Sequence, residues 1–91
     1  MMITGYRNVE DIYAAARRIR DRLSEQGEEA TAAEIEKFMK TFWTTASEAL
    51  DEMIRCLLMA RPTVEKTSDK DTLDLLDSAV AGATKLLNTG G

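Results

Sequence analysis

Residues 31–61 read TAAEIEKFMKTFWTTASEALDEMIRCLLMAR, and this stretch decides the predicted fold. Thr31 and Glu34 at its start have the spacing of a capping box, a common beginning of a helix. Apolar residues then recur every three to four positions as far as Pro62, which lacks a backbone N–H and disfavours helix in the preceding residue. We therefore predict one helix over residues 31–61, about 45 Å long at about 1.5 Å per residue.

Two shorter helices are predicted on either side of this central helix. Asn8 and Asp11 have the spacing of a helix start, and Gly27 is typical of a helix end, which bounds a first helix at residues 8–26. Residues 62–67 form a linker in this interpretation, and a third helix covers residues 69–88. The sequence shows no strand-like alternation, so we predict an all-α helical bundle. It forms a single domain over residues 1–91, with flexible ends at residues 1–7 and 89–91.

The central helix is about ten residues longer than its neighbours, so its apolar stripe would extend about 15 Å beyond a simple bundle. An exposed patch of that kind is unusual on a monomer, and a symmetric homodimer would cover it. The predicted dimer seam comprises Ile35, Met39, Phe42, Ala46, Ala49, Met53, Cys56 and Ala60. The alternative is a kink near Thr44 and Thr45 that folds the second half of this helix back over the other two.

The composition limits the chemistry that the chain can perform. The 91 residues include no histidine and a single cysteine. The commonest general base near neutral pH and the commonest zinc ligand are therefore missing, and Cys56 lacks a histidine partner for a thiolate dyad. Bundles that hold two iron ions also use histidine, so carboxylate pairs do not indicate such a centre here. We expect no catalytic residue, no metal ligands and no cofactor site.

The charge balance and the hydropathy pattern bear on partners and compartment. Twelve Lys and Arg stand against sixteen Asp and Glu, a net charge of −4, which does not favour nucleic acid. No apolar run is long enough to span a membrane, and the first residues lack the pattern of a secretory signal. We therefore expect a cytoplasmic protein without membrane contact, in which Cys56 is a free thiol.

Two groups of residues are candidates for binding a partner protein. The first is the only basic cluster, on the helix at residues 8–26, although Asp21 and Glu25 have the spacing to form ion pairs with it. The second is a groove beside Phe38, Trp43 and Ile54 in the central stretch, since tryptophan is enriched at interfaces. The candidate partner-binding residues are Arg17, Arg18, Arg20, Arg22, Phe38, Trp43 and Ile54. Met59 lies outside the apolar stripe of the central helix, and we assign it to neither the core nor the dimer seam.

The function predicted from these features is a non-catalytic protein–protein interaction module, such as a small adaptor, regulator, chaperone or inhibitor. The alternative is a helix-turn-helix DNA-binding regulator, with residues 31–39 as its first helix and residues 45–54 as its recognition helix. Lys40 stands where the turn of that motif often has glycine, and the second helix would present Glu48 and Asp51 to phosphates. An enzyme is the least favoured class, because no nucleophile has a base beside it.

Overall fold

The computed structural model of the chain describes residues 6–88 and contains four helices in that range. These are α1 (Val9–Glu25), α2 (Glu29–Lys40), α3 (Ala46–Thr67) and α4 (Lys70–Asn88). The all-α bundle is confirmed, but the number of helices is four instead of three. Of the predicted flexible ends, residues 1–5 and 89–91 lie outside the described residues.

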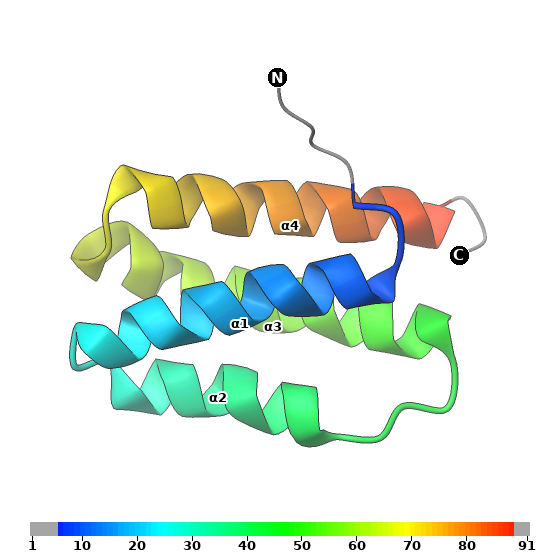
Figure 1. The fold of residues 1–91 in the computed structure, drawn as a ribbon, viewed down its shortest axis with the longest axis horizontal. Coiled ribbons are helices and arrows are strands. Elements are labelled where there is room, and N and C mark those ends of the chain that lie inside the picture. Colours follow the sequence, from blue (N-terminus) through cyan, green and yellow to red (C-terminus); the bar gives the residue numbers. More distant parts are fainter. Residues whose placement is uncertain (1–5, 89–91) are drawn as a thin grey trace.

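The four helices form a flat bundle with principal extents of 36 × 33 × 17 Å. Figure 1 shows α1 crossing in front of α3, with α2 and α4 on opposite sides of this central pair. Both α1 and α3 pack on each of the other helices, whereas α2 and α4 make no contact with each other among the described residues. Within residues 6–88, no helix combines the length and the apolarity needed to cross a membrane.

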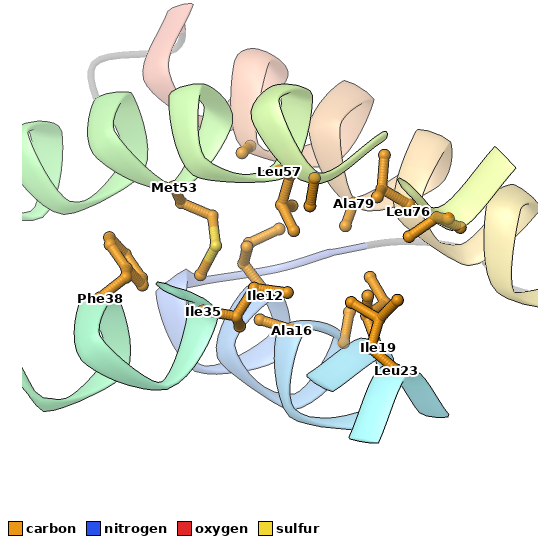
Figure 2. Close-up of a cluster of buried hydrophobic side chains, with 14 of the residues drawn as sticks. Ile12, Ala16, Ile19, Leu23, Ile35, Phe38, Met53, Leu57, Leu76 and Ala79 are labelled. Carbon is orange, nitrogen blue, oxygen red and sulfur yellow. The ribbon is translucent and has the colours of Figure 1, made fainter. Parts of the chain in front are cut away.

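The hydrophobic core lies between α1 and α3 and is closed on either side by α2 and α4 (Figure 2). Its largest fully buried side chains are Ile12, Ile19, Leu23, Ile35, Leu50, Met53, Leu57, Val64 and Leu76. Each such side chain contributes about 1.5–3 kcal/mol relative to an exposed position. All four helices supply at least one of them, so the chain covers its own apolar stripes.

The ends of α1 follow from local signals that the sequence shows directly. The side chain of Asn8 accepts a hydrogen bond from the backbone N–H of Asp11 at 3.1 Å, as expected of a helix cap. At the other end, Gly27 has a φ of 80°, and the N–H of Glu28 donates to the carbonyl of Leu23 at 2.9 Å. This is a Schellman motif, and it confirms the predicted boundary at residues 8–26.

The single central helix predicted over residues 31–61 is wrong, because the chain breaks between Lys40 and Ala46. Thr45 caps α3 by accepting a hydrogen bond from the N–H of Glu48 at 3.1 Å, and the Glu48 carboxylate accepts from the N–H of Thr44 at 3.2 Å. The capping box of this region is therefore at Thr45, whereas α2 begins at Glu29 without a side-chain cap. The alternative of a chain folding back near Thr44 and Thr45 is the better description.

The predicted linker at residues 62–67 is also wrong, because α3 continues through Pro62 to Thr67. Pro62 is exposed, so the backbone carbonyl that loses its intrahelical partner faces the solvent side of the helix. On the opposite side, Ala60 and Val64 are buried in the core and hold the helix on both sides of the proline. Packing of these side chains overrides the local preference of proline to end a helix.

The residues of the predicted dimer seam do not form one continuous helix face. Ile35, Ala49, Met53 and Ala60 are buried within the chain's own bundle. Met39 and Cys56 are half-buried, and Ala46 and Phe42 are exposed. The predicted seam follows from the length of a single central helix, and the structure has the two shorter helices α2 and α3 in its place. Homodimerisation itself stays a prediction.

Candidate functional site

The strongest candidate for a binding site is a groove between α2 and α3, with a volume of about 470 Å³. This α2–α3 groove also borders residues 41 and 43 of the segment that joins the two helices. Its volume lies within the range of about 300–1,000 Å³ that is common for ligand pockets. The break in the predicted central helix creates the groove, because a continuous helix would have no second wall.

The floor of the groove is apolar and contains an aromatic pair. The rings of Phe38 and Trp43 have centroids 5.4 Å apart, and Tyr13 of α1 meets Phe38 edge to face at 5.6 Å. Cys56, Met59 and Ala60 complete this part of the lining. Such ring arrangements contribute about 0.5–1.5 kcal/mol beyond the burial of their area, so the floor is held in place by aromatic packing.

The Trp43 indole is a special feature of this floor. Its Nε1 is buried and has no hydrogen-bond partner within the described residues. An unsatisfied buried donor costs about 1–3 kcal/mol, and the packing of the ring against Phe38 must offset that cost. Trp43 is the only tryptophan of the chain, so its fluorescence reports specifically on this groove.

One large apolar side chain is exposed in the groove, and another is exposed near it in the sequence. Met59 lines the groove and is 75% exposed, whereas Phe42 is 92% exposed and is not part of the lining, although its neighbours Thr41 and Trp43 are. Leu58 is 50% exposed but does not belong to the lining, because it lies on the flank of α3 that faces away from α2. Exposed aromatic and methionine side chains beside an apolar groove are typical of interaction surfaces.

Four charged residues surround the apolar floor, two of each sign. Glu34 and Lys37 come from α2, and Glu52 and Arg55 come from α3. Arg55 lies 3.8 Å from a carboxylate oxygen of Glu52, which is a loose pair. Within residues 6–88, neither Glu34 nor Lys37 forms an ion pair, so both charges are free for an external partner.

Cys56 does not supply a reactive thiolate to the groove. Burial raises the pKa of its thiol to about 11, and the nearby carboxylates of Glu34 and Glu52 act in the same direction. Its sulfur lies 4.0 Å from the backbone carbonyl of Glu34. A thiol in this state is a poor nucleophile at neutral pH and behaves as a small apolar lining residue.

The structure brings together only part of the predicted aromatic site. Phe38 and Trp43 lie side by side, and both line the groove. Ile54 does not join them, because it packs against the core from another side of α3. The sequence interpretation gave Met59 no role and placed Phe42 in the dimer seam. The capping-box spacing of Thr45 and Glu48 is the signal that would have located the turn beside both.

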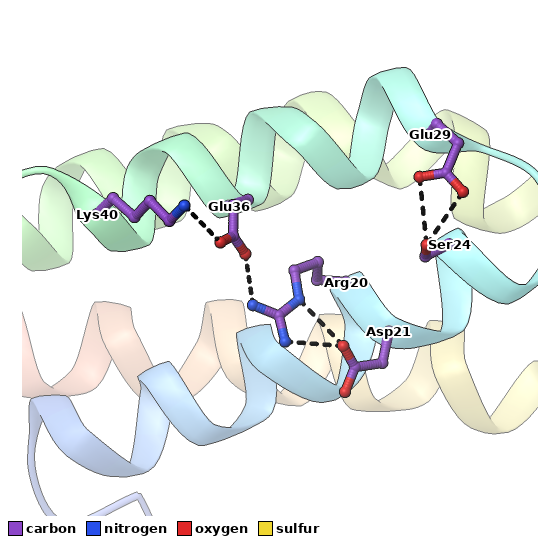
Figure 3. A network of polar contacts seen from close by, with 6 residues as sticks. All are labelled: Arg20, Asp21, Ser24, Glu29, Glu36 and Lys40. Atoms are coloured by element: carbon purple, nitrogen blue, oxygen red, sulfur yellow. Dashed lines mark hydrogen bonds and ion pairs between the residues drawn. The ribbon is translucent and has the colours of Figure 1, made fainter.

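The arginine cluster is divided between ion pairs and solvent. Arg20 donates to Asp21 and to Glu36 of α2, and Lys40 also pairs with Glu36 (Figure 3). The hydrogen bond from Arg20, followed by that from Lys40, holds the pKa of Glu36 below its usual value. This network links α1 to α2, so the role of Arg20 is structural.

The other three arginines differ from Arg20. Arg22 pairs with Glu25 at 3.0 Å and reaches Asp69 at 3.6 Å, so it connects α1 to the start of α4. Arg17 and Arg18 are exposed and form no ion pair within residues 6–88. Only these two remain available to an acidic partner.

The arrangement of α2 and α3 differs from that of a helix-turn-helix motif. The alternative interpretation correctly ended one helix near Lys40 and began the next after Thr45. However, Figure 1 shows α2 and α3 running in nearly opposite directions, whereas the two helices of that motif cross at about 90–120°. In addition, α3 exposes Glu48 and Asp51 at its start, a charge that phosphates repel.

The residues that make up the α2–α3 groove therefore stand as the candidate site on their geometry alone. Among the described residues, no group of three or more His, Cys, Asp or Glu side chains lies close enough to hold a metal ion. Comparison of the chain with family models, with curated proteins and with solved structures finds no match.

Proposed function

We propose that this chain is a non-catalytic protein–protein interaction module that binds through the α2–α3 groove. The observation that carries the proposal is the 75% exposure of Met59 in an apolar groove of about 470 Å³, with the 92% exposed Phe42 between two lining residues in the sequence. Within residues 6–88, the chain's own side chains leave this surface uncovered. A partner that covers it gains the burial of two large apolar side chains, at about 25 cal/mol per Å² of apolar area.

The polar rim gives the groove its selectivity. Glu34, Lys37, Glu52 and Arg55 surround the apolar floor, an arrangement that resembles the apolar centre and polar rim of known interfaces. A partner must therefore offer apolar side chains at its centre and charges of both signs at its edge. An amphipathic segment of another chain meets both requirements.

Site-specific photocrosslinking tests this proposal with a built-in control. A photoreactive amino acid is introduced at Met59, which lines the groove, or at Leu58, which is also exposed but lies outside it. We expect protein crosslinks from position 59 in a native extract and far fewer from position 58. Equal yields from the two positions, or none from position 59, would contradict the proposal.

Substitution extends the same comparison to affinity. A charge at the centre of an apolar contact loses the burial energy and adds a desolvation cost. Met59→Glu should therefore weaken binding of the crosslinked protein by about tenfold or more, a change of about 1.4 kcal/mol. Leu58→Glu introduces the same charge one residue away and should leave binding unchanged.

A further inference from the structure

We infer that the occupant of the α2–α3 groove is a second copy of this chain, which lies antiparallel on α2 and places its Phe42 at the groove. This inference rests on the proposed function and names the partner. It differs from the seam predicted along a continuous helix, because its contact residues are those that the bundle leaves exposed. The argument has three steps, which concern spacing, charge and apolar contact.

Four of the six lining residues in and just after α2 have the same spacing when read in either direction. These four are Ala30, Glu34, Lys37 and Thr41, with intervals of four, three and four positions, whereas the lining residues Thr31 and Phe38 fall outside this pattern. A two-fold axis midway between Glu34 and Lys37 therefore places each of the four residues opposite a residue of the same set. This is the condition for an isologous contact between identical chains.

In the symmetric dimer, each charged residue on this face of α2 lies opposite a residue of opposite charge. The two-fold arrangement sets Glu34 of one copy against Lys37 of the other, and it does so twice per dimer. Both side chains are exposed, and neither is used in an ion pair within residues 6–88. A foreign partner would need an independently matched pair of charges, whereas a second copy supplies it from the same sequence.

The exposed aromatic ring also finds an apolar surface in this arrangement. Reversal of α2 about the axis brings Phe42 of one copy to the Ala30 end of the other copy's groove. Thr31 lies 3.4 Å from Thr63 between their hydroxyl oxygens, so residues of α3 that follow Cys56 are at this end. Met59 and Ala60 line the groove there, and the ring of Phe42 covers them. Both exposed apolar side chains are buried in each copy by one symmetric contact.

Sedimentation equilibrium with charge-swap variants tests the inference. The wild-type chain should dissociate reversibly from twice its mass of 10.1 kDa to that mass on dilution. Glu34→Lys and Lys37→Glu each place like charges opposite each other at two sites, which should raise the dimer Kd by roughly tenfold at low salt. The double variant restores opposite charges and should return the Kd to the wild-type value. Asp74→Lys, a reversal on α4, is the matched control and should leave the Kd unchanged.

The outcomes separate this inference from the proposed function. A chain that stays at 10.1 kDa at every concentration overturns the second copy as occupant. Crosslinks from Met59 to a different protein then still support the interaction module. A double variant that is weaker than either single variant also overturns the antiparallel pairing. Circular dichroism of each variant is the control for folding. We expect the wild-type spectrum, because the changed positions are exposed.

Discussion

Gly82 lies inside α4, where glycine costs about 1 kcal/mol relative to alanine, and the structure gives the reason for its presence. A β-carbon at this position would lie 2.7 Å from Cγ of Tyr6 and closer still to Cδ2. The ring of Tyr6 therefore packs directly on the backbone of α4. Its hydroxyl oxygen also lies 2.7 Å from Oγ of Ser78, one helical turn earlier. Tyr6, three residues before the start of α1, thus packs against α4 near the other end of the chain.

The expected effect of Gly82→Ala depends on whether Tyr6 is present. Carbon atoms in contact prefer separations of about 3.5–4.0 Å, so the ring must move by about 1 Å. That movement loses the hydrogen bond to Ser78, about 1 kcal/mol, and part of the ring burial, about 1–2 kcal/mol. The gain in helix propensity returns only about 1 kcal/mol. Gly82→Ala should therefore destabilise the wild-type chain by about 1–2 kcal/mol.

In a Tyr6→Ala background, the same substitution has no ring to displace. Gly82→Ala should then stabilise the protein by about 1 kcal/mol, so the sign of its effect reverses. Urea unfolding followed by circular dichroism at constant m-value measures all four free energies of unfolding. Tyr6→Phe is the control that removes only the contact with Ser78. If Gly82→Ala is equally stabilising in both backgrounds, the packing of Tyr6 on α4 is refuted.

Three further predictions concern the helix boundaries and the groove. Pro62→Ala should restore a helix hydrogen bond in α3 and stabilise the protein by about 1–3 kcal/mol, measured as a rise in the urea midpoint, and an unchanged midpoint would contradict a helix through Pro62. Thr45→Ala should cost about 1 kcal/mol through loss of the cap of α3, whereas Thr31→Ala should cost less, because it removes only the long contact with the Thr63 hydroxyl, and the opposite order would favour the capping box at Thr31. Because burial raises the pKa of Cys56 from 9.0 to about 11, only the unfolded chain ionises in that interval, so stability should fall as pH rises through it. Cys56→Ala should remove this part of the decline in urea midpoints, and an identical decline would refute the raised pKa.

The sequence predicts those helix boundaries that depend on neighbouring residues alone. Asn8 caps α1 and Gly27 ends it, both through hydrogen bonds within a few positions of the chain. Asp69 likewise accepts from the backbone N–H of Thr72 at 3.1 Å at the start of α4, as its place before the apolar stripe indicates. These interactions join residues that are close together in the sequence, which is why the predicted ranges 8–26 and 69–88 are correct to within one residue.

The break between α2 and α3 has a local signal in the spacing of Thr45 and Glu48, but the main interpretation follows the continuous apolar phase and misses it. Apolar residues fit the phase of one helix from Ile35 through Met53, although α2 and α3 are separate helices whose apolar faces meet in the same core. Each helix turns its own apolar stripe to that core, so a phase that matches across the break does not require a continuous helix. Thr31 and Thr45 both begin a capping-box pattern, but Thr31 lies inside α2, which begins at Glu29, and only Thr45 caps a helix.

The turn also explains why the candidate site was only partly predicted. Phe42 and Trp43 are neighbours in the sequence, and both fit the stripe of a continuous helix or its edge. In the extended segment that begins at Thr41, Trp43 instead turns onto Phe38 while Phe42 points to solvent. Closing the bundle by this turn therefore leaves one large aromatic side chain uncovered beside the groove. The argument for a second copy therefore no longer depends on the apolar stripe of one long helix. It depends on the exposed apolar side chains of Phe42 and Met59.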